Sequence, residues 1–158
     1  MADLLLLFRV GRERYAIEAI SVVEVIPKVN LSTMPKPPQH IVGQFNYQGH
    51  IVPVLDLSQQ LGTAVSRSVL STRIVLINLG QSGEKRLLGL MVEQVTDTLR
   101  REHTRPIKDS MKLPQPSYLG EKLVYGKEII QCLCVDQILS NNTYDQLLTP
   151  PKIVNSIA

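Results

Sequence analysis

The chain has 158 residues, a length that suits one domain or two small subdomains and lets roughly 70% of the unfolded surface become buried. Hydrophobic residues make up 44% of the sequence but aromatic residues only 4%, with no Trp, so the core must consist of Val, Ile and Leu, which favours strands. The formal net charge of +3 comes from basic residues scattered among acidic ones, a pattern typical of solvated surface.

The first apolar run, residues 4–8, follows an acidic residue without a basic leader and is too short for a signal peptide or a membrane span. We therefore expect a cytoplasmic protein with no direct membrane insertion. Across residues 4–10 the apolar side chains occupy both alternating sets of positions, which predicts a strand buried on both faces for most of its length. A turn at residues 11–14 leads to residues 15–17, the second half of a hairpin.

The next segment mixes two periodicities. Ala19, Val22 and Ile26 have the spacing of one helical face, whereas the density of β-branched residues favours a strand. We predict a short helical turn at residues 18–21 that leads into a strand at residues 22–26. The proline that follows ends this strand.

Residues 41–62 carry the most information in the chain. Two apolar stretches are separated by Gln48 and Gly49, which predicts two strands joined by a tight turn, with Gly49 supplying a positive φ. Pro53 lies inside the second stretch and removes one ladder donor. It should therefore lie at an edge, a bulge or a bend.

A short helix, residues 57–61, is predicted directly after this hairpin. Either Asp56 or Ser58 can accept a hydrogen bond from its free N–H groups, and Gly62 ends it. Asp56 ends a strand, as the phosphoacceptor of a receiver domain does. The acidic pair, the downstream Lys and the alternating βα pattern of a receiver are absent from the sequence, so helix capping is the better interpretation.

The second half of the chain predicts five more strands, at residues 72–79, 86–93, 95–100, 118–125 and 127–135. A bulge is expected at residues 93–94, and Gly126 makes the turn of the last hairpin. Asp136 is predicted to cap a final turn at residues 137–140. Residues 63–71 are small and polar and form a loop or the boundary between two halves.

Proline marks three segments without regular structure. Residues 31–39 predict a stiff, extended connection, with a ligand for another module as the alternative. Residues 102–116 form a long polar loop of the kind that is often functional or mobile. The tail, residues 141–158, shows little periodicity and is expected to pack loosely or to be disordered.

A weak internal repeat indicates two similar halves. Residues 52–61 can be aligned with residues 130–139, because both form a predicted strand that runs into a capped helical turn. About ten short strands are too many for one small sandwich core, which agrees with two β-subdomains. Cys132 and Cys134 lie on one face of the last strand; they are interpreted as two small buried hydrophobes, with metal binding or redox chemistry as the alternative.

The sequence contains no recognisable catalytic apparatus. His40, His50 and His103 are isolated, and no zinc, nucleophile-elbow or P-loop motif is present. Nucleic-acid binding is the strongest rival from composition, because residues 100–112 hold five basic side chains and small β-barrels often bind nucleic acid. A stacking platform of aromatic residues is not visible, so we expect no nucleic-acid partner. Because no catalytic motif is recognisable, we also expect no cofactor.

The residues of the 41–62 segment resemble the signature of the CheW family, the adaptor domain of bacterial chemosensory arrays. The matching positions are Ile41, Gly43, Asn46, Gly49, Val52, Pro53, Val54, Asp56 and Leu57. Residues 8–26 resemble the opening strand, turn and V-x-E element of the family, and residues 87–99 resemble its G-x-x-V segment. The resemblance covers roughly residues 4–139.

The resemblance implies an all-β fold of two small five-stranded β-barrel subdomains packed side by side, with short helical turns. Residues 1–140 would form this domain, with the boundary between subdomains near residues 63–71, and residues 141–158 a C-terminal tail. It also implies a non-enzymatic adaptor that links the cytoplasmic tip of a methyl-accepting chemoreceptor to the regulatory domain of a CheA-type histidine kinase. Such an adaptor is recruited to membrane-associated receptor arrays.

Partner-contact positions carried over from the family are Val22, Glu24, Gly43, Gln48, Gly49, Val95 and Thr98. For the valines the alternative is plain core packing, and for the glycines it is backbone geometry alone. Glu24 differs, because a charge between two valines on a strand should face solvent or a partner.

Two positions depart from the family pattern. The family usually carries Arg where this chain has Gln48, so an ion pair made there is lost or replaced. An aliphatic residue is common where this chain has Thr98. We infer an adaptor for a non-standard receptor or kinase, for example one of an accessory pathway that does not govern swimming. A regulator that binds another enzyme, such as a methyltransferase, and an orphan nucleic-acid-binding barrel remain as alternatives.

Overall fold

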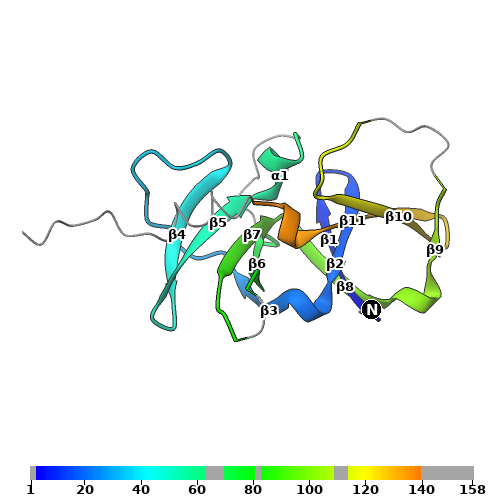
Figure 1. Ribbon diagram of the computed structural model, residues 1–158, viewed down its shortest axis with the longest axis horizontal. Helices are drawn as coiled ribbons and strands as arrows, with labels where there is room; N and C mark the ends of the chain where they lie inside the picture. The colour runs from blue at the N-terminus through cyan, green and yellow to red at the C-terminus, as the bar shows by residue number, and fades with distance from the viewer. Residues whose placement is uncertain (1–2, 63–69, 81–82, 109–113, 140–158) are drawn as a thin grey trace, which may run out of the picture.

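The computed structural model describes residues 3–62, 70–80, 83–108 and 114–139. These residues form strands, one short helix and three 3₁₀ turns (Figure 1). The strands are β1 (Leu4–Val10), β2 (Glu13–Glu18), β3 (Val22–Pro27), β4 (Ile41–Tyr47), β5 (His50–Asp56), β6 (Arg73–Asn78), β7 (Leu87–Val92), β8 (Gln94–Arg100), β9 (Arg105–Pro106), β10 (Leu119–Tyr125) and β11 (Glu128–Leu133). The helix is α1 (Leu57–Gln60), and the 3₁₀ turns are η1 (Ala19–Ser21), η2 (Arg101–His103) and η3 (Val135–Gln137).

The strands form two sheets that lie side by side (Figure 1). The six-stranded sheet has the order β8-β1-β2-β11-β10-β9, and the five-stranded sheet has the order β3-β6-β7-β5-β4. The mainly-β, two-part architecture expected from the sequence is therefore confirmed. One sheet has six strands because the short β9 pairs with β10, and no ladder between described residues joins the two edge strands of either sheet.

The chain passes from one sheet to the other at two places. It leaves the six-stranded sheet through η1 and returns at Glu93, between β7 and β8. The bulge expected at residues 93–94 is thus a change of sheet. Residues 63–71 lie between two elements of the five-stranded sheet, so the chain does not change sheet there, and residues 63–69 fall outside the described residues.

The five-stranded sheet curls so that its two edges, β3 and β4, approach each other. After β3, Ser32 exchanges two backbone hydrogen bonds with Gln44 of β4, at 2.8 and 3.0 Å. Ile26 of β3 and Phe45 of β4 pack against the same buried cluster inside the curl. The sheet therefore has a barrel-like interior although the strand ladder stays open.

The largest core cluster fills the space between the two sheets. Its buried members are Leu6, Phe8, Val10, Tyr15, Ile17, Ile41, Leu55, Leu57, Val75, Ile77, Leu88, Leu90, Val92, Leu133 and Ile138. Aliphatic side chains dominate it, as the composition predicts, and Phe8 stacks on Tyr15 with 6.2 Å between ring centroids. A second cluster, which includes Leu5 and Leu7, covers the opposite face of the six-stranded sheet, so β1 is buried on both faces as expected.

The hairpin of β4 and β5 has the predicted form. Both turn residues have positive φ, 49° at Gln48 and 86° at Gly49, which is the type I′ turn that matches strand twist. Pro53 lies one residue before the parallel pairing of β5 with β7 begins at Val54, so no donor is missing from that ladder. Asp56 caps α1 by accepting a hydrogen bond from the Ser58 N–H at 3.0 Å.

The predicted final turn, with Asp136 as its cap, and the predicted loop at residues 102–116 both differ in detail from the structure. Strand pairing continues to Cys134, whose N–H donates to the Tyr118 carbonyl at 2.8 Å. The final turn therefore begins at Val135, and Asp136 makes no capping hydrogen bond. The segment expected to be a loop, residues 102–116, contains most of η2 and the two-residue strand β9; its residues 109–113 fall outside the described residues.

The internal repeat corresponds to a structural one. In the alignment of residues 52–61 with residues 130–139, Val54 matches Cys132. Val54 faces Gly89 in the parallel pairing of β5 with β7, and Cys132 faces Ala16 in the parallel pairing of β11 with β2. Each sheet thus contains one strand, β5 or β11, that pairs in parallel with a neighbour and runs into a short helical turn.

Candidate partner-binding surfaces

Four residues at one end of the five-stranded sheet form the first candidate surface, which we call the turn surface: Glu24, Tyr47, Gln48 and Gly49. The register of β3 with β6 shifts between Val22 and Glu24, so Val23 is an extra residue there. Such a bulge bends the strand and re-aims its side chains. Glu24 is exposed and accepts a hydrogen bond from the Tyr47 hydroxyl at 3.3 Å, across the gap between the two edge strands.

Tyr47 is the residue of this surface that sequence reasoning missed. Its phenol pKa is raised by partial burial and by the neighbouring Glu24 carboxylate. The sequence places Tyr47 directly before Gln48, but only the curl of the sheet brings it to Glu24. In this chain the Glu24 carboxylate thus accepts a hydrogen bond from the neutral phenol of Tyr47.

The border surface comprises Ile20, Val22, Val95 and Thr98, on η1 and two edge strands where the sheets meet. Val22 of β3 and Val95 of β8 are half-buried and pack against the core cluster between the sheets. Ile20 is 82% exposed on η1, and Thr98 is exposed on β8 opposite Leu6. All the predicted site residues except Gly43 thus divide between two surfaces.

Gly43 belongs to neither surface, because it is buried. A Cβ atom built on it would lie 2.8 Å from the Leu31 Cβ and 2.8 Å from the Ser32 carbonyl oxygen. Glycine is needed here for the close approach of the connection that follows β3. For Gly43 the structure therefore supports backbone geometry over partner contact.

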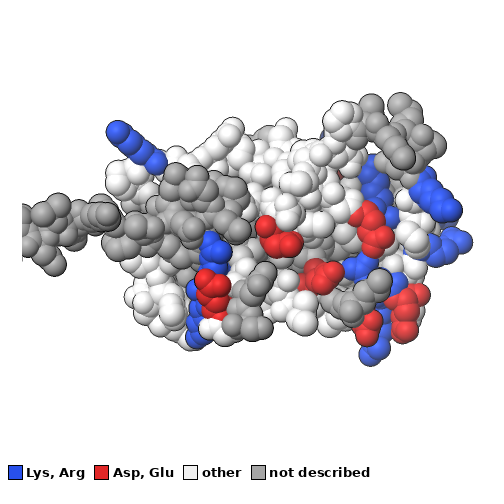
Figure 2. Space-filling model, viewed as in Figure 1, with Lys and Arg blue, Asp and Glu red and all other residues white. Residues whose placement is uncertain are grey.

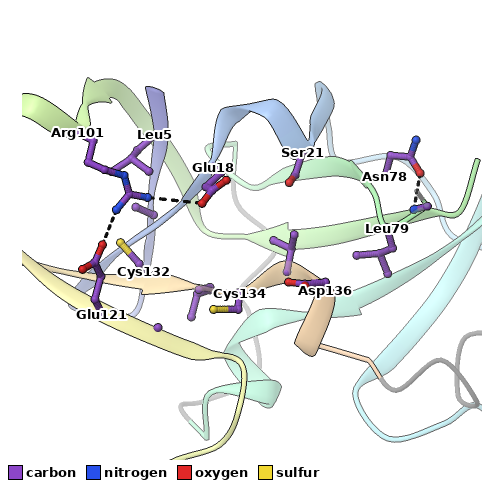
Figure 3. Close-up of a pocket in the computed structure, with 15 residues that line it drawn as sticks. Leu5, Glu18, Ser21, Asn78, Leu79, Arg101, Glu121, Cys132, Cys134 and Asp136 are labelled. Atoms are coloured by element: carbon purple, nitrogen blue, oxygen red, sulfur yellow. Dashed lines mark hydrogen bonds and ion pairs between the residues drawn. The ribbon is translucent and has the colours of Figure 1, made fainter. Parts of the chain in front are cut away.

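A cavity of about 490 Å³ lies beside η1, between the sheets. Its lining includes Glu18, Ser21, Arg101, Glu121 and Asp136, and the two cysteines. The Arg101 guanidinium lies between two carboxylates, 3.7 Å from Glu18 and hydrogen-bonded to Glu121 (Figure 3). No motif in the sequence indicated this cavity, since its walls come from strands distant in the chain.

The prediction of two buried cysteines is confirmed for Cys132 but not for Cys134. Both are free thiols; Cys132 is buried, and Cys134 is partly exposed. Burial raises the pKa of Cys132 to about 11 and also raises that of Cys134, so both are protonated at neutral pH. Among the described residues no group of three or more His, Cys, Asp or Glu side chains is placed to hold a metal ion.

Other candidate groups take structural or surface positions. Asp56 is fully buried and serves as the α1 cap. His50 is exposed in the hairpin of β4 and β5, and His103 lies 3.8 Å from the exposed Glu102. On the face drawn in Figure 2, basic and acidic side chains alternate in small groups. Within the described part of the chain, no helix has the length and apolar character needed to cross a membrane.

The structure is a β-scaffold of two sheets that carries two candidate surfaces. The family model described as the CheW-like domain matches residues 4–142, so the chain belongs to the CheW-like family. It is 22% identical to a chemotaxis protein CheW of Helicobacter pylori over 140 residues, covering 85% of this chain and 80% of that protein. It is 26% identical to a chemotaxis protein CheW of Klebsiella aerogenes over 138 residues, covering 86% of this chain and 81% of that protein.

A solved structure supports the fold. The crystal structure of the scaffolding protein TtCheW from Thermoanaerobacter tengcongensis superimposes with a TM-score of 0.74 at 22% sequence identity. The similarity covers 90% of this chain and 91% of that chain. The two-sheet arrangement is therefore shared with a CheW protein.

Proposed function

We propose that this protein is a non-catalytic chemosensory adaptor that couples a chemoreceptor to a CheA-type histidine kinase in the cytoplasm, at membrane-associated receptor arrays. Membership of the CheW-like family over residues 4–142 is the observation that carries the proposal. The relatives named above are chemotaxis proteins of similar length. Residues 1–140 act as the adaptor domain in this proposal, and residues 141–158 form a tail outside it.

The border surface is proposed to bind the cytoplasmic tip of the receptor. Ile20 and Val23 are large apolar side chains that are 82% and 48% exposed, next to the half-buried Val22. Exposed apolar groups beside a cavity suit the apolar face of a helix, as in helix-in-groove recognition. Glu18 and Ser21 connect this apolar stretch to the cavity that they line.

The turn surface is proposed to bind the regulatory domain of the kinase. It consists of a hairpin turn and a strand bulge, whose side chains project from the end of the five-stranded sheet. Gln48 and Gly49 are exposed, and Gly49 is held by the Asn46 side chain, which accepts a hydrogen bond from the Gly49 N–H at 2.9 Å. A turn fixed in this way presents its residues to a partner with little loss of conformational freedom.

Titration calorimetry against two separate partners tests the proposal: the isolated regulatory domain of a CheA-type kinase and a receptor-tip fragment, both from the same organism. We expect both to bind, each with a negative heat-capacity change from apolar burial. Ile20→Asp should weaken receptor binding by about fivefold or more, the effect of losing a substantial interface residue, and should leave stability within about 0.5 kcal/mol.

Leu70→Asp is the matched control for this substitution. Leu70 is 98% exposed but lies near the start of β6, away from η1 in the chain. It should change neither affinity. Binding of neither partner would reject the adaptor function, and equal effects of both substitutions on receptor binding would reject the border surface as the receptor site.

A further inference from the structure

Glu24 is an exposed carboxylate of the turn surface. Among the described residues no Lys, Arg or His forms an ion pair with it, and its contact is the Tyr47 hydroxyl at 3.3 Å. A neutral phenol satisfies one lone pair of the carboxylate and contributes no positive charge. Among the described residues, the Glu24 carboxylate is therefore not neutralised by an ion pair.

The geometry of the strand directs this charge outward. The bulge at Val23 leaves both Val23 and Glu24 exposed in succession, whereas a regular strand would turn one of them inward. The adjacent turn adds the neutral Gln48 and the side-chain-free Gly49. The Glu24 carboxylate, with the exposed Val23 before it in the chain, thus lies near an uncharged turn, to which it is linked through Tyr47.

We propose that Glu24 selects a kinase regulatory domain that presents a Lys or Arg side chain to the turn surface, so that the ion pair forms between the two proteins and not within this one. The inference rests on the proposed function, since it names the chemistry of the partner at that surface. Charge complementarity of this kind contributes mainly to partner choice and to association rate. Because the pair is at a solvent-exposed rim, its effect is screened by salt.

The Tyr47 hydrogen bond is compatible with this role. At 3.3 Å between two partly exposed groups it is long for a bond to a carboxylate, and the second carboxylate oxygen has no hydrogen-bond donor among the described residues. A guanidinium or ammonium from a partner can therefore bind the free oxygen while the phenol holds the carboxylate in place. Tyr47 acts as a positioning residue in this arrangement.

The test measures affinity for the isolated regulatory domain of the CheA-type kinase from the same organism, by titration calorimetry at low and at high salt. Glu24→Gln should lower the affinity by about twofold to fivefold at low salt, the range of one exposed charge pair, and should reduce the salt dependence. Gln48→Arg should have the same effect, because it places a cation of this protein one residue from the side chain that already reaches Glu24. Glu13→Gln, at an exposed carboxylate of the other sheet, controls for net charge and should change neither quantity.

The possible results distinguish failure of the Glu24 inference from failure of the proposed adaptor function. Unchanged affinity and salt dependence in both Glu24→Gln and Gln48→Arg would overturn the inference while leaving the adaptor function in place. An equal loss of receptor-fragment binding in Glu24→Gln would also overturn it, because the charge would not be specific to the kinase. Absence of kinase binding by the unaltered protein would reject the proposed function itself. The fold of each variant is checked by its denaturation midpoint, which should stay at that of the unaltered protein because both positions are exposed.

Discussion

Replacing Gly43 by alanine separates a structural role for this signature glycine from a role in partner contact. The new Cβ would lie 2.8 Å from both the Leu31 Cβ and the Ser32 carbonyl oxygen, closer than van der Waals contact allows. Neither atom is the end of a flexible side chain, and the Ser32 carbonyl accepts a hydrogen bond from the Gln44 N–H at 3.0 Å. Relief of the clash must therefore move backbone and weaken the bridge that ties β4 to the segment after β3.

We expect a loss of about 1–3 kcal/mol in the free energy of unfolding, as for overpacking of a tight site. Each kcal/mol lowers Tm by about 2–4 °C in a domain of this size. Denaturant unfolding measures the loss, and affinity for the kinase and receptor fragments is measured in parallel on the folded protein. The affinities should be unchanged.

Gly49→Ala is the control for backbone strain alone. Its φ is 86°, but nothing lies within 4 Å of a Cβ built there, so only the cost of a left-handed residue, about 1 kcal/mol, should appear. A Gly43→Ala protein of unchanged stability and reduced partner affinity would refute the structural interpretation. It would return Gly43 to the set of partner contacts.

Three further substitutions test the α1 cap and the two thiols. Asp56→Ala should destabilise the protein by about 1–2 kcal/mol in denaturant unfolding, because the buried Ser58 N–H loses its acceptor; no measurable loss would contradict the capping role. The pKa of Cys132 is raised from 9.0 to about 11, so the unfolded chain releases this proton at lower pH than the folded protein does. Stability should therefore fall as pH rises from about 9 to 11, and Cys132→Val should flatten that fall in unfolding measured across this pH range. Cys134→Ala should flatten it less, because Cys134 is more exposed; equal slopes in all three proteins would contradict the assignment.

Local sequence patterns predicted most strands and turns, because the formation of a strand or a turn depends largely on residues that are neighbours in the chain. A nearly continuous apolar run predicted β1, and the Gln48-Gly49 turn predicted the hairpin of β4 and β5. The strand order was not accessible in the same way, since the pairing of β11 with β2 joins opposite ends of the chain. The two-residue β9 was missed because it contains Pro106, which argues against a strand except at an edge, and an edge is where it lies.

For the candidate site too, local properties were predictable from the sequence and contacts between distant residues were not. The exposure of Glu24 followed from a charge between two valines, and it is confirmed. The partner of Glu24 was not predictable, because Tyr47 reaches it only through the curl of the five-stranded sheet. The role of Gly43 was not predictable either. A glycine in a motif does not reveal whether a partner or the chain itself requires the absence of a side chain.

The two sheet crossings explain why the border surface lies where it does. Val22 directly follows η1, where the chain enters the five-stranded sheet, and Val95 follows Glu93, where it leaves. Both valines pack against the core cluster that fills the space between the sheets. The residues proposed to contact a receptor are thus among those that fix the two sheets relative to each other. Because a close-packed core has few alternative arrangements, a receptor helix that binds there as proposed would meet a rigid surface, on the same strand, β3, that carries both Val22 and Glu24.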